Sequence, residues 1–103
     1  MYLDGGEKGL AEGMDKILKC PIFIAVITSK FVKDEESYHI CSYANSLGKI
    51  MYAVVKRGTR WDSFKHFDWR KVYYFKNSDE FPEIIGDIKR DFNFLKAVMR
   101  YEN

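Results

Sequence analysis

The sequence has few of the residues that mark metal-binding, disulfide-bonded or nucleic-acid-binding proteins. It contains two cysteines, Cys20 and Cys41, whose spacing is neither a CxxC pair nor a zinc pattern, and His39 and His66 do not complete one. We therefore expect two reduced thiols and no metal site. The 17 basic and 15 acidic residues leave a net charge of only +2. That small excess does not indicate a nucleic-acid partner.

The sequence also lacks a long apolar segment. Its longest apolar run is PIFIAVIT, residues 21–28, which is far shorter than the ~20 residues that a membrane-spanning helix needs. The run is internal and lacks the N-terminal context of a signal peptide. We therefore expect a soluble, cytoplasmic protein that does not enter a membrane.

What the sequence does contain indicates one folded domain over residues 1–103. Apolar residues make up 47% of the chain and aromatic residues 17%, which favours a packed core over disorder. The apolar runs at 21–28 and 50–55 are typical of strands covered on both faces, as in a parallel sheet. A third strand is predicted at 72–75, after a polar and aromatic connection over 56–71.

Three helices are predicted, over residues 7–20, over residues 35–48 and from about residue 79 onward. The side chains expected to face the core in the second helix are Ile40, Tyr43, Ala44 and Leu47. Those expected in the last helix are Ile85, Ile88, Phe92, Leu95 and Met99. Ser78 or Asp79 is expected to cap the last helix, with Pro82 in its first turn.

This alternation predicts an α/β fold, with a parallel sheet and helices on both faces. Ligands of such sheets bind outside the carboxyl ends of the strands. In this chain that edge includes residues 4–6, a predicted loop over 29–34, and residues 56–61.

Two segments carry a resemblance to a known family. YLDGGEKGLAEGMDKILKCPIFIAVITSKFV, residues 2–32, resembles the middle of a TIR domain, where a buried strand closes with a serine and then an aromatic residue, here Ser29 and Phe31. CSYANSLGKIMYAVV, residues 41–55, resembles the TIR helix that contains an alanine, ends in Gly-Lys and enters the next core strand. The resemblance implies a flavodoxin-like or TIR-like sheet.

The chain departs from the TIR pattern in its first residues. A TIR domain starts with a further strand and helix, and this chain begins at what resembles the end of the second strand. A sheet without that strand would expose unpaired backbone groups at its edge. We therefore expect self-association, or association with another TIR-like domain. The resemblance also implies association of this kind, and it implies a role in signalling, in innate immunity or defence.

A second departure concerns chemistry. Enzymatic TIR domains carry a glutamate four residues before the helix alanine, where a carboxylate stabilises the positive charge that develops as NAD loses nicotinamide. Counting back from Ala44 reaches Ile40. Residues Tyr43 and Ala44 bear a weaker resemblance to a helix step of nucleoside deoxyribosyltransferases, which a catalytic glutamate also precedes. The same count finds no glutamate here. Glu36, one turn before Ile40, is a candidate to replace the missing catalytic glutamate. The alternative is that Glu36 is an ordinary glutamate in the first turn of the helix, where it complements the helix dipole.

The remaining candidates line the expected nucleotide pocket at the strand ends. They are Asp4, Ser29, Phe31, His39 and Trp61. A surface position for His39 and a loop role for Ser29 are the alternatives, and the aromatics of residues 56–71 are expected to anchor that connection to the core.

Three functions therefore follow from the sequence. The first is a TIR-like signalling module that associates and needs no cofactor. The second is an NAD- or nucleotide-cleaving enzyme, an NAD nucleosidase, completed by Glu36 or by a residue of a partner chain. A third is a nucleotide sensor that binds NAD without cutting it.

Overall fold

The structure, a computed structural model, describes residues 2–3 and 20–102 of the chain. Its strands are β1 (Tyr2–Leu3), β2 (Ile22–Ile27), β3 (Ile50–Lys56) and β4 (Trp69–Phe75). Its helices are α2 (Ser29–Lys33), α3 (Glu35–Ser46) and α4 (Phe81–Glu102), with the short 3-10 turns η1 (Asp62–Phe64) and η2 (Ser78–Glu80). The predicted helix over residues 7–20 lies almost wholly outside the described residues.

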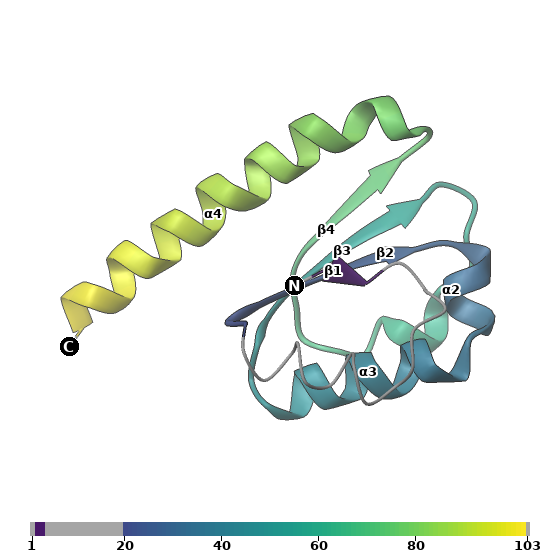
Figure 1. Cartoon of the computed structure of the whole chain (residues 1–103), viewed down its shortest axis with the longest axis horizontal. Helices are drawn as coiled ribbons and strands as arrows, with labels where there is room; N and C mark the ends of the chain where they lie inside the picture. The colour runs from purple at the N-terminus through teal and green to yellow at the C-terminus, as the bar shows by residue number, and fades with distance from the viewer. Residues whose placement is uncertain (1, 4–19, 103) are drawn as a thin grey trace.

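The described strands form one parallel sheet in the order β1-β2-β3-β4 (Figure 1). The prediction of an α/β fold with a parallel sheet is confirmed. Both apolar runs are strands, and five consecutive residues of β3 are buried, as expected for a strand covered on both faces. β4 begins earlier than predicted, because Trp69 already pairs with Met51 of β3. The Trp69 side chain also donates a 2.8 Å hydrogen bond from its Nε1 to the Phe64 carbonyl.

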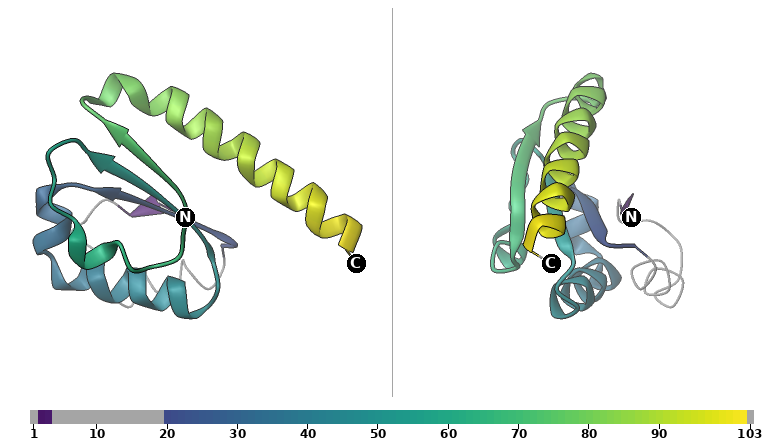
Figure 2. Two further views of the ribbon diagram at one scale, coloured as in Figure 1. Left: turned by 180° about the vertical axis from the view of Figure 1, so that it is seen from behind. Right: turned by 90° about the vertical axis from the view of Figure 1, so that its left-hand side faces the viewer.

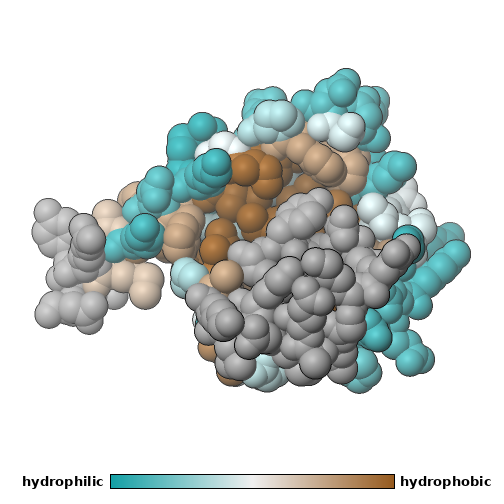
Figure 3. Space-filling view, viewed as in Figure 1, coloured by the Kyte–Doolittle hydropathy of each residue, from teal (hydrophilic) through white to brown (hydrophobic). Residues whose placement is uncertain are grey.

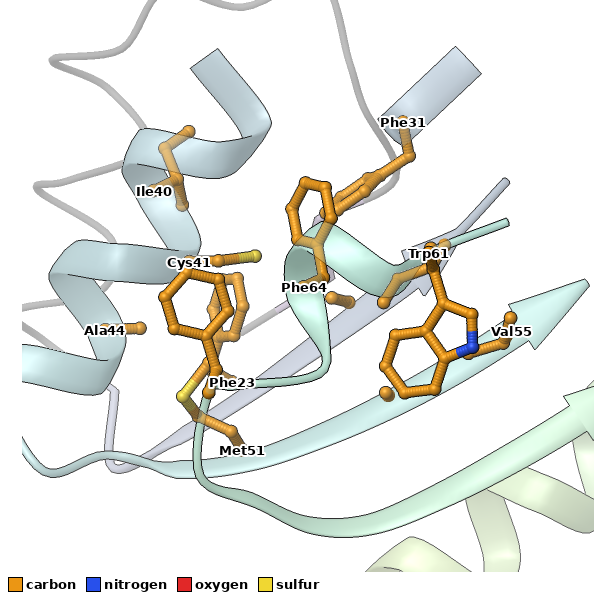
Figure 4. Close-up of a cluster of buried hydrophobic side chains, with 13 residues drawn as sticks. Phe23, Phe31, Ile40, Cys41, Ala44, Met51, Val55, Trp61 and Phe64 are labelled. Atoms are coloured by element: carbon orange, nitrogen blue, oxygen red, sulfur yellow. The ribbon is translucent and has the colours of Figure 1, made fainter. Parts of the chain in front are cut away.

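One face of the sheet is covered by α2, α3 and the connection that contains η1. Its core contains residues of β2, β3, α3 and the connection (Figure 4). Trp61, Phe64 and Phe67 from the connection are each at most 6% exposed. The prediction that these aromatics anchor the connection to the core is therefore confirmed.

The other face of the sheet is covered by α4, so helices lie on both faces (Figure 2). Ile84 and Ile88 of α4 pack in a cluster with Tyr52 and Val54 of β3 and with Phe75 of β4. Right-handed crossovers between strands in simple sequential order all fall on one face. The opposite face is therefore left to the helix that follows the last strand.

Two predictions for residues 29–48 are wrong. Residues 29–33 form α2 rather than a loop, because Thr28 Oγ1 accepts the Phe31 N–H at 3.3 Å and the Phe31 side chain is fully buried. The buried stripe of α3 is Ser37, Ile40, Cys41 and Ala44, so the predicted stripe is confirmed at Ile40 and Ala44 and wrong at Leu47. Leu47 is 41% exposed because α3 ends at Ser46, where the chain turns through Gly48 at a φ of 69°.

Two predictions for the last helix are also wrong. Ser78 and Asp79 do not cap α4, because both lie inside the 3-10 turn η2 that precedes it. The N-cap of η2 is Asn77, whose backbone N–H donates to Glu80 Oε2 at 3.1 Å. The core-facing stripe was placed too far along the helix, because Met99 is 55% exposed. Figure 1 shows the reason: the C-terminal half of α4 runs past the end of the sheet.

Candidate functional site

The residues predicted for a nucleotide pocket do not come together as a set of exposed side chains. Ser29 opens α2 and is exposed, whereas Phe31 is fully buried with its ring centroid 5.4 Å from that of Phe64. Trp61 is 6% exposed and packs edge-on against Trp69 at 6.4 Å. Phe31 and Trp61 therefore act as core residues, and Asp4 lies outside the described residues.

The two polar candidates on α3 are exposed. Glu36 lies in the first turn, where its backbone N–H is capped by Asp34 Oδ1 at 3.0 Å. His39 lies on the surface beside the Tyr38 ring, at 6.3 Å between centroids. Ile40, at the position of the expected glutamate, is 3% exposed and packs in the core (Figure 4). A role for Glu36 as the acid stays a prediction.

The structure instead brings together a polar network between α4 and the sheet, centred on Asp91. Asp91 Oδ2 accepts a hydrogen bond of 2.6 Å from the Tyr52 hydroxyl. The Arg70 guanidinium donates to both carboxylate oxygens at 3.2 Å, and Lys71 Nζ lies 3.7 Å from Oδ1. The Asp91 side chain is only 7% exposed, so these partners compensate a nearly buried charge.

Asp87, one turn earlier on α4, extends the network. Its carboxylate accepts a hydrogen bond from the Tyr73 hydroxyl. Lys71 Nζ lies 3.8 Å from Asp87 Oδ2, so this lysine stands between the two aspartates. Arg90 adds an exposed ion pair at 3.6 Å within the helix.

A β-bulge makes the double contact with Asp91 possible. Met51 pairs with Trp69 and Tyr52 pairs with Lys71, so Arg70 is an extra residue of β4 at this point. Successive strand residues normally point to opposite faces of a sheet, whereas a bulge re-aims a side chain. Arg70 and Lys71 consequently reach the same carboxylate.

The network has a defined protonation state at neutral pH. Burial, and then the hydrogen bond to Asp91, raise the pKa of the Tyr52 hydroxyl; burial and the hydrogen bond to Asp87 do the same for the pKa of Tyr73. The hydrogen bonds from Arg70 hold the pKa of Asp91 below its usual value, and the bond from Tyr73 holds down the pKa of Asp87. Both tyrosines therefore donate and both aspartates accept. With its carboxylates occupied in this way, the network serves to fix α4 on the sheet.

Replacing Tyr52 with phenylalanine is expected to lower the free energy of unfolding by about 1.5–3 kcal/mol, the range for a hydrogen bond to a charged group. Urea denaturation at neutral pH measures it. Tyr74→Phe is the matched control, because Tyr74 is 51% exposed on the same sheet and its loss should stay within about 0.5 kcal/mol. Equal effects of the two substitutions would contradict an anchoring role for the Tyr52 hydroxyl.

Beyond Asp91, α4 carries apolar side chains that its own sheet does not cover. We call residues 92–102 the overhang; its side chains are described to residue 99. Phe94 is 61% exposed, Met99 55% and Val98 36%, while Phe92 and Leu95 are half-buried. At about 100° per residue, these five side chains form one broad apolar face.

The opposite side of the overhang carries polar side chains. Asn93 and Lys96 lie there, and Lys96 Nζ stands 5.3 Å from the centroid of the Phe92 ring. A helix segment of this composition is typical of one that is buried against a partner. The overhang is therefore the strongest candidate for a functional surface in the described part of the chain.

Sequence reasoning missed the network at Asp91, although two parts of it left a signal. Asp87 and Asp91 are spaced i, i+4 beside Ile84 and Ile88, so they share a side of the helix. Tyr52 places a hydroxyl in an otherwise apolar buried strand, where it needs a partner. The bulge at Arg70, which completes the network, had no recognisable signal.

Two further properties bear on function. Within residues 2–3 and 20–102, no group of three or more His, Cys, Asp or Glu side chains could hold a metal ion. None of the described helices combines the length and apolar character needed to cross a membrane. Comparisons with protein-family models, with curated proteins and with solved structures each find no match for this chain.

Proposed function

We propose that this protein is an interaction module that associates with a second copy of itself through the overhang of α4. The observation that carries the proposal is the exposed apolar face formed by Phe94, Val98 and Met99 on a helix whose first half is firmly packed. The network at Asp91 holds α4 at the point where it leaves the sheet. The overhang is thereby presented in a fixed direction, which lowers the entropic cost of binding.

The proposal also includes a flavodoxin-like fold and a biological role. In a flavodoxin-like sheet of order 2-1-3-4-5, the last three strands are consecutive neighbours. The run β2-β3-β4 supports such an arrangement, with α3 in the crossover between β2 and β3. The pairing of β1 with β2 departs from this arrangement. In the order 2-1-3-4-5 the second strand is not a neighbour of the third, which is the position that β2 would take. A TIR-like signalling module in immunity or defence is the setting that we propose.

The energetics favour a weak, concentration-dependent dimer. Fully burying one large apolar side chain contributes about 1.5–3 kcal/mol, and those of the overhang are partly covered already. If each copy buries a few such side chains, and the entropic cost of association is subtracted, the binding free energy is about 8 kcal/mol. This corresponds to a dissociation constant in the micromolar range.

Self-association is tested by light scattering coupled to gel filtration over a range of protein concentrations. The unchanged chain should pass from monomer to dimer as its concentration rises. Val98→Lys should weaken this association by about tenfold or more, because a charge then has to be buried at the interface.

Asn93→Lys is the matched control for this test. It adds the same charge to the same part of α4, but on the polar side of the overhang, and should leave association nearly unchanged. A chain that stays monomeric at every concentration, or two variants that behave alike, would overturn the proposal.

A further inference from the structure

A second apolar surface lies beside α4, on the same side of the sheet. We call it the β2-side surface; it is formed by the half-buried residues Ile22, Ile24, Ile50 and Ile85. They come from β2, β3 and the first half of α4. Figure 3 shows apolar side chains gathered alongside α4 on the face turned to the viewer. None of the four residues that form this surface is charged.

The geometry of a helix on a sheet explains why this surface is only half covered. A helix is about 10 Å wide and neighbouring strands are about 4.8 Å apart, so one helix covers about two strands. α4 is fixed over β3 and β4 by its bonds to Tyr52, Arg70 and Tyr73. The part of the face over β2 therefore lies at the side of α4 rather than beneath it.

We propose that the overhang of one copy lies on the β2-side surface of a second copy, and that the second copy returns the contact through a two-fold axis. This inference rests on the proposed self-association and adds the site on the partner where the overhang binds. Phe94, Val98 and Met99 would then cover the isoleucines of the β2-side surface. Asn93 and Lys96 would stay in water on the outer side of the overhang.

Three observations favour a second copy as the occupant. The overhang points away from its own sheet, so it cannot cover the β2-side surface of its own chain (Figures 1 and 2). The two surfaces match in character, since the exposed face of the overhang and the β2-side surface are both formed by apolar side chains on the α4 side of the molecule.

The third observation is one of size. A stable interface uses about 20–30 residues from each partner. The overhang, residues 92–102, is too short to supply that number alone. A reciprocal exchange gives each copy both its overhang and its β2-side surface. The contact then comes closer to this size, as suits the weak dimer proposed above, and contacts of this kind are closed by two-fold symmetry.

Disulfide trapping in the full-length chain tests the geometry, in a Cys20→Ser background that removes the half-exposed native thiol. Two variants are made, Ile24→Cys and Met99→Cys, and each is oxidised alone and in an equal mixture. The mixture should give a covalent dimer with a yield about tenfold or more above either variant alone, because docking raises the effective concentration of the two thiols. Asn93→Cys mixed with Ile24→Cys is the control, and it should stay near background.

The outcomes separate this inference from the proposed function. If light scattering detects a dimer but Met99→Cys links mainly to itself and not to Ile24→Cys, the overhangs pair with each other and the reciprocal docking is overturned. If no dimer forms, both proposals fail. A non-covalent readout guards against poor folding of the cysteine variants: Ile24→Lys, checked by circular dichroism, should weaken association as strongly as Val98→Lys, and an unchanged dimer would overturn the docking site.

Discussion

Replacing Phe64 with alanine is expected to lower the free energy of unfolding by about 3–5 kcal/mol, the range for truncating a buried phenylalanine. Phe64 is 1% exposed and comes from η1, in the long connection between β3 and β4. Its ring centroid lies 5.4 Å from that of Phe31, 5.5 Å from that of Tyr38 and 6.2 Å from that of Phe67. Its removal would leave a cavity at the junction of α2, α3 and the connection, because each of these elements contributes a ring.

Phe94→Ala is the matched control for this substitution. It removes the same side chain from α4, where Phe94 is 61% exposed. In urea denaturation at low protein concentration, its effect should stay within about 0.5 kcal/mol, whereas at high concentration it should weaken the dimer. If Phe64→Ala cost no more than Phe94→Ala, the connection would be a mobile loop instead of a part of the core.

The part of the fold that was predictable from sequence is the part set by local patterns. The runs at 21–28 and 50–55 became β2 and β3 because short, uninterrupted apolar segments rich in β-branched residues suit strands that are covered on both faces. Ile40 was expected in the buried stripe of its helix and is 3% exposed. α2 was not predictable in this way, because five residues carry too little periodicity. It forms through the Thr28 cap and through a contact between Phe31 and Phe64, which are far apart in sequence.

The candidate surface was predictable in outline from element lengths. A helix of 22 residues is about 33 Å long, while a strand of seven residues spans about 23 Å. A helix that covers such a strand must therefore extend past it by about 10 Å, wherever it begins. The apolar stripe of α4 was assigned to the core because its period is regular, and the period does not reveal where the sheet ends. Chain order likewise placed Phe31 and Trp61 near the strand ends without revealing that both side chains are buried in the core.

Replacing Ile88 with alanine is expected to lower the free energy of unfolding by about 2–5 kcal/mol, and Met99→Ala is expected to leave it nearly unchanged. The two residues lie three turns apart on α4, and sequence periodicity assigned both to the same stripe. Ile88 is 1% exposed, against Tyr52, Val54 and Phe75, whereas Met99 is 55% exposed in the overhang. Truncation of Ile88 opens a cavity under α4, while truncation of Met99 removes atoms that are already in contact with water.

The same pair of variants separates folding from association. Urea denaturation at low protein concentration reports the stability of the monomer, and light scattering at high concentration reports the dimer. Met99→Ala should weaken the dimer without changing monomer stability, because its side chain belongs to the proposed interface. Ile88→Ala should do the reverse in any chain that remains folded, because Ile88 offers no surface to a partner. A loss of monomer stability in Met99→Ala comparable to that in Ile88→Ala would show that α4 packs on its own sheet along its whole length, which would remove the exposed face on which both proposals depend.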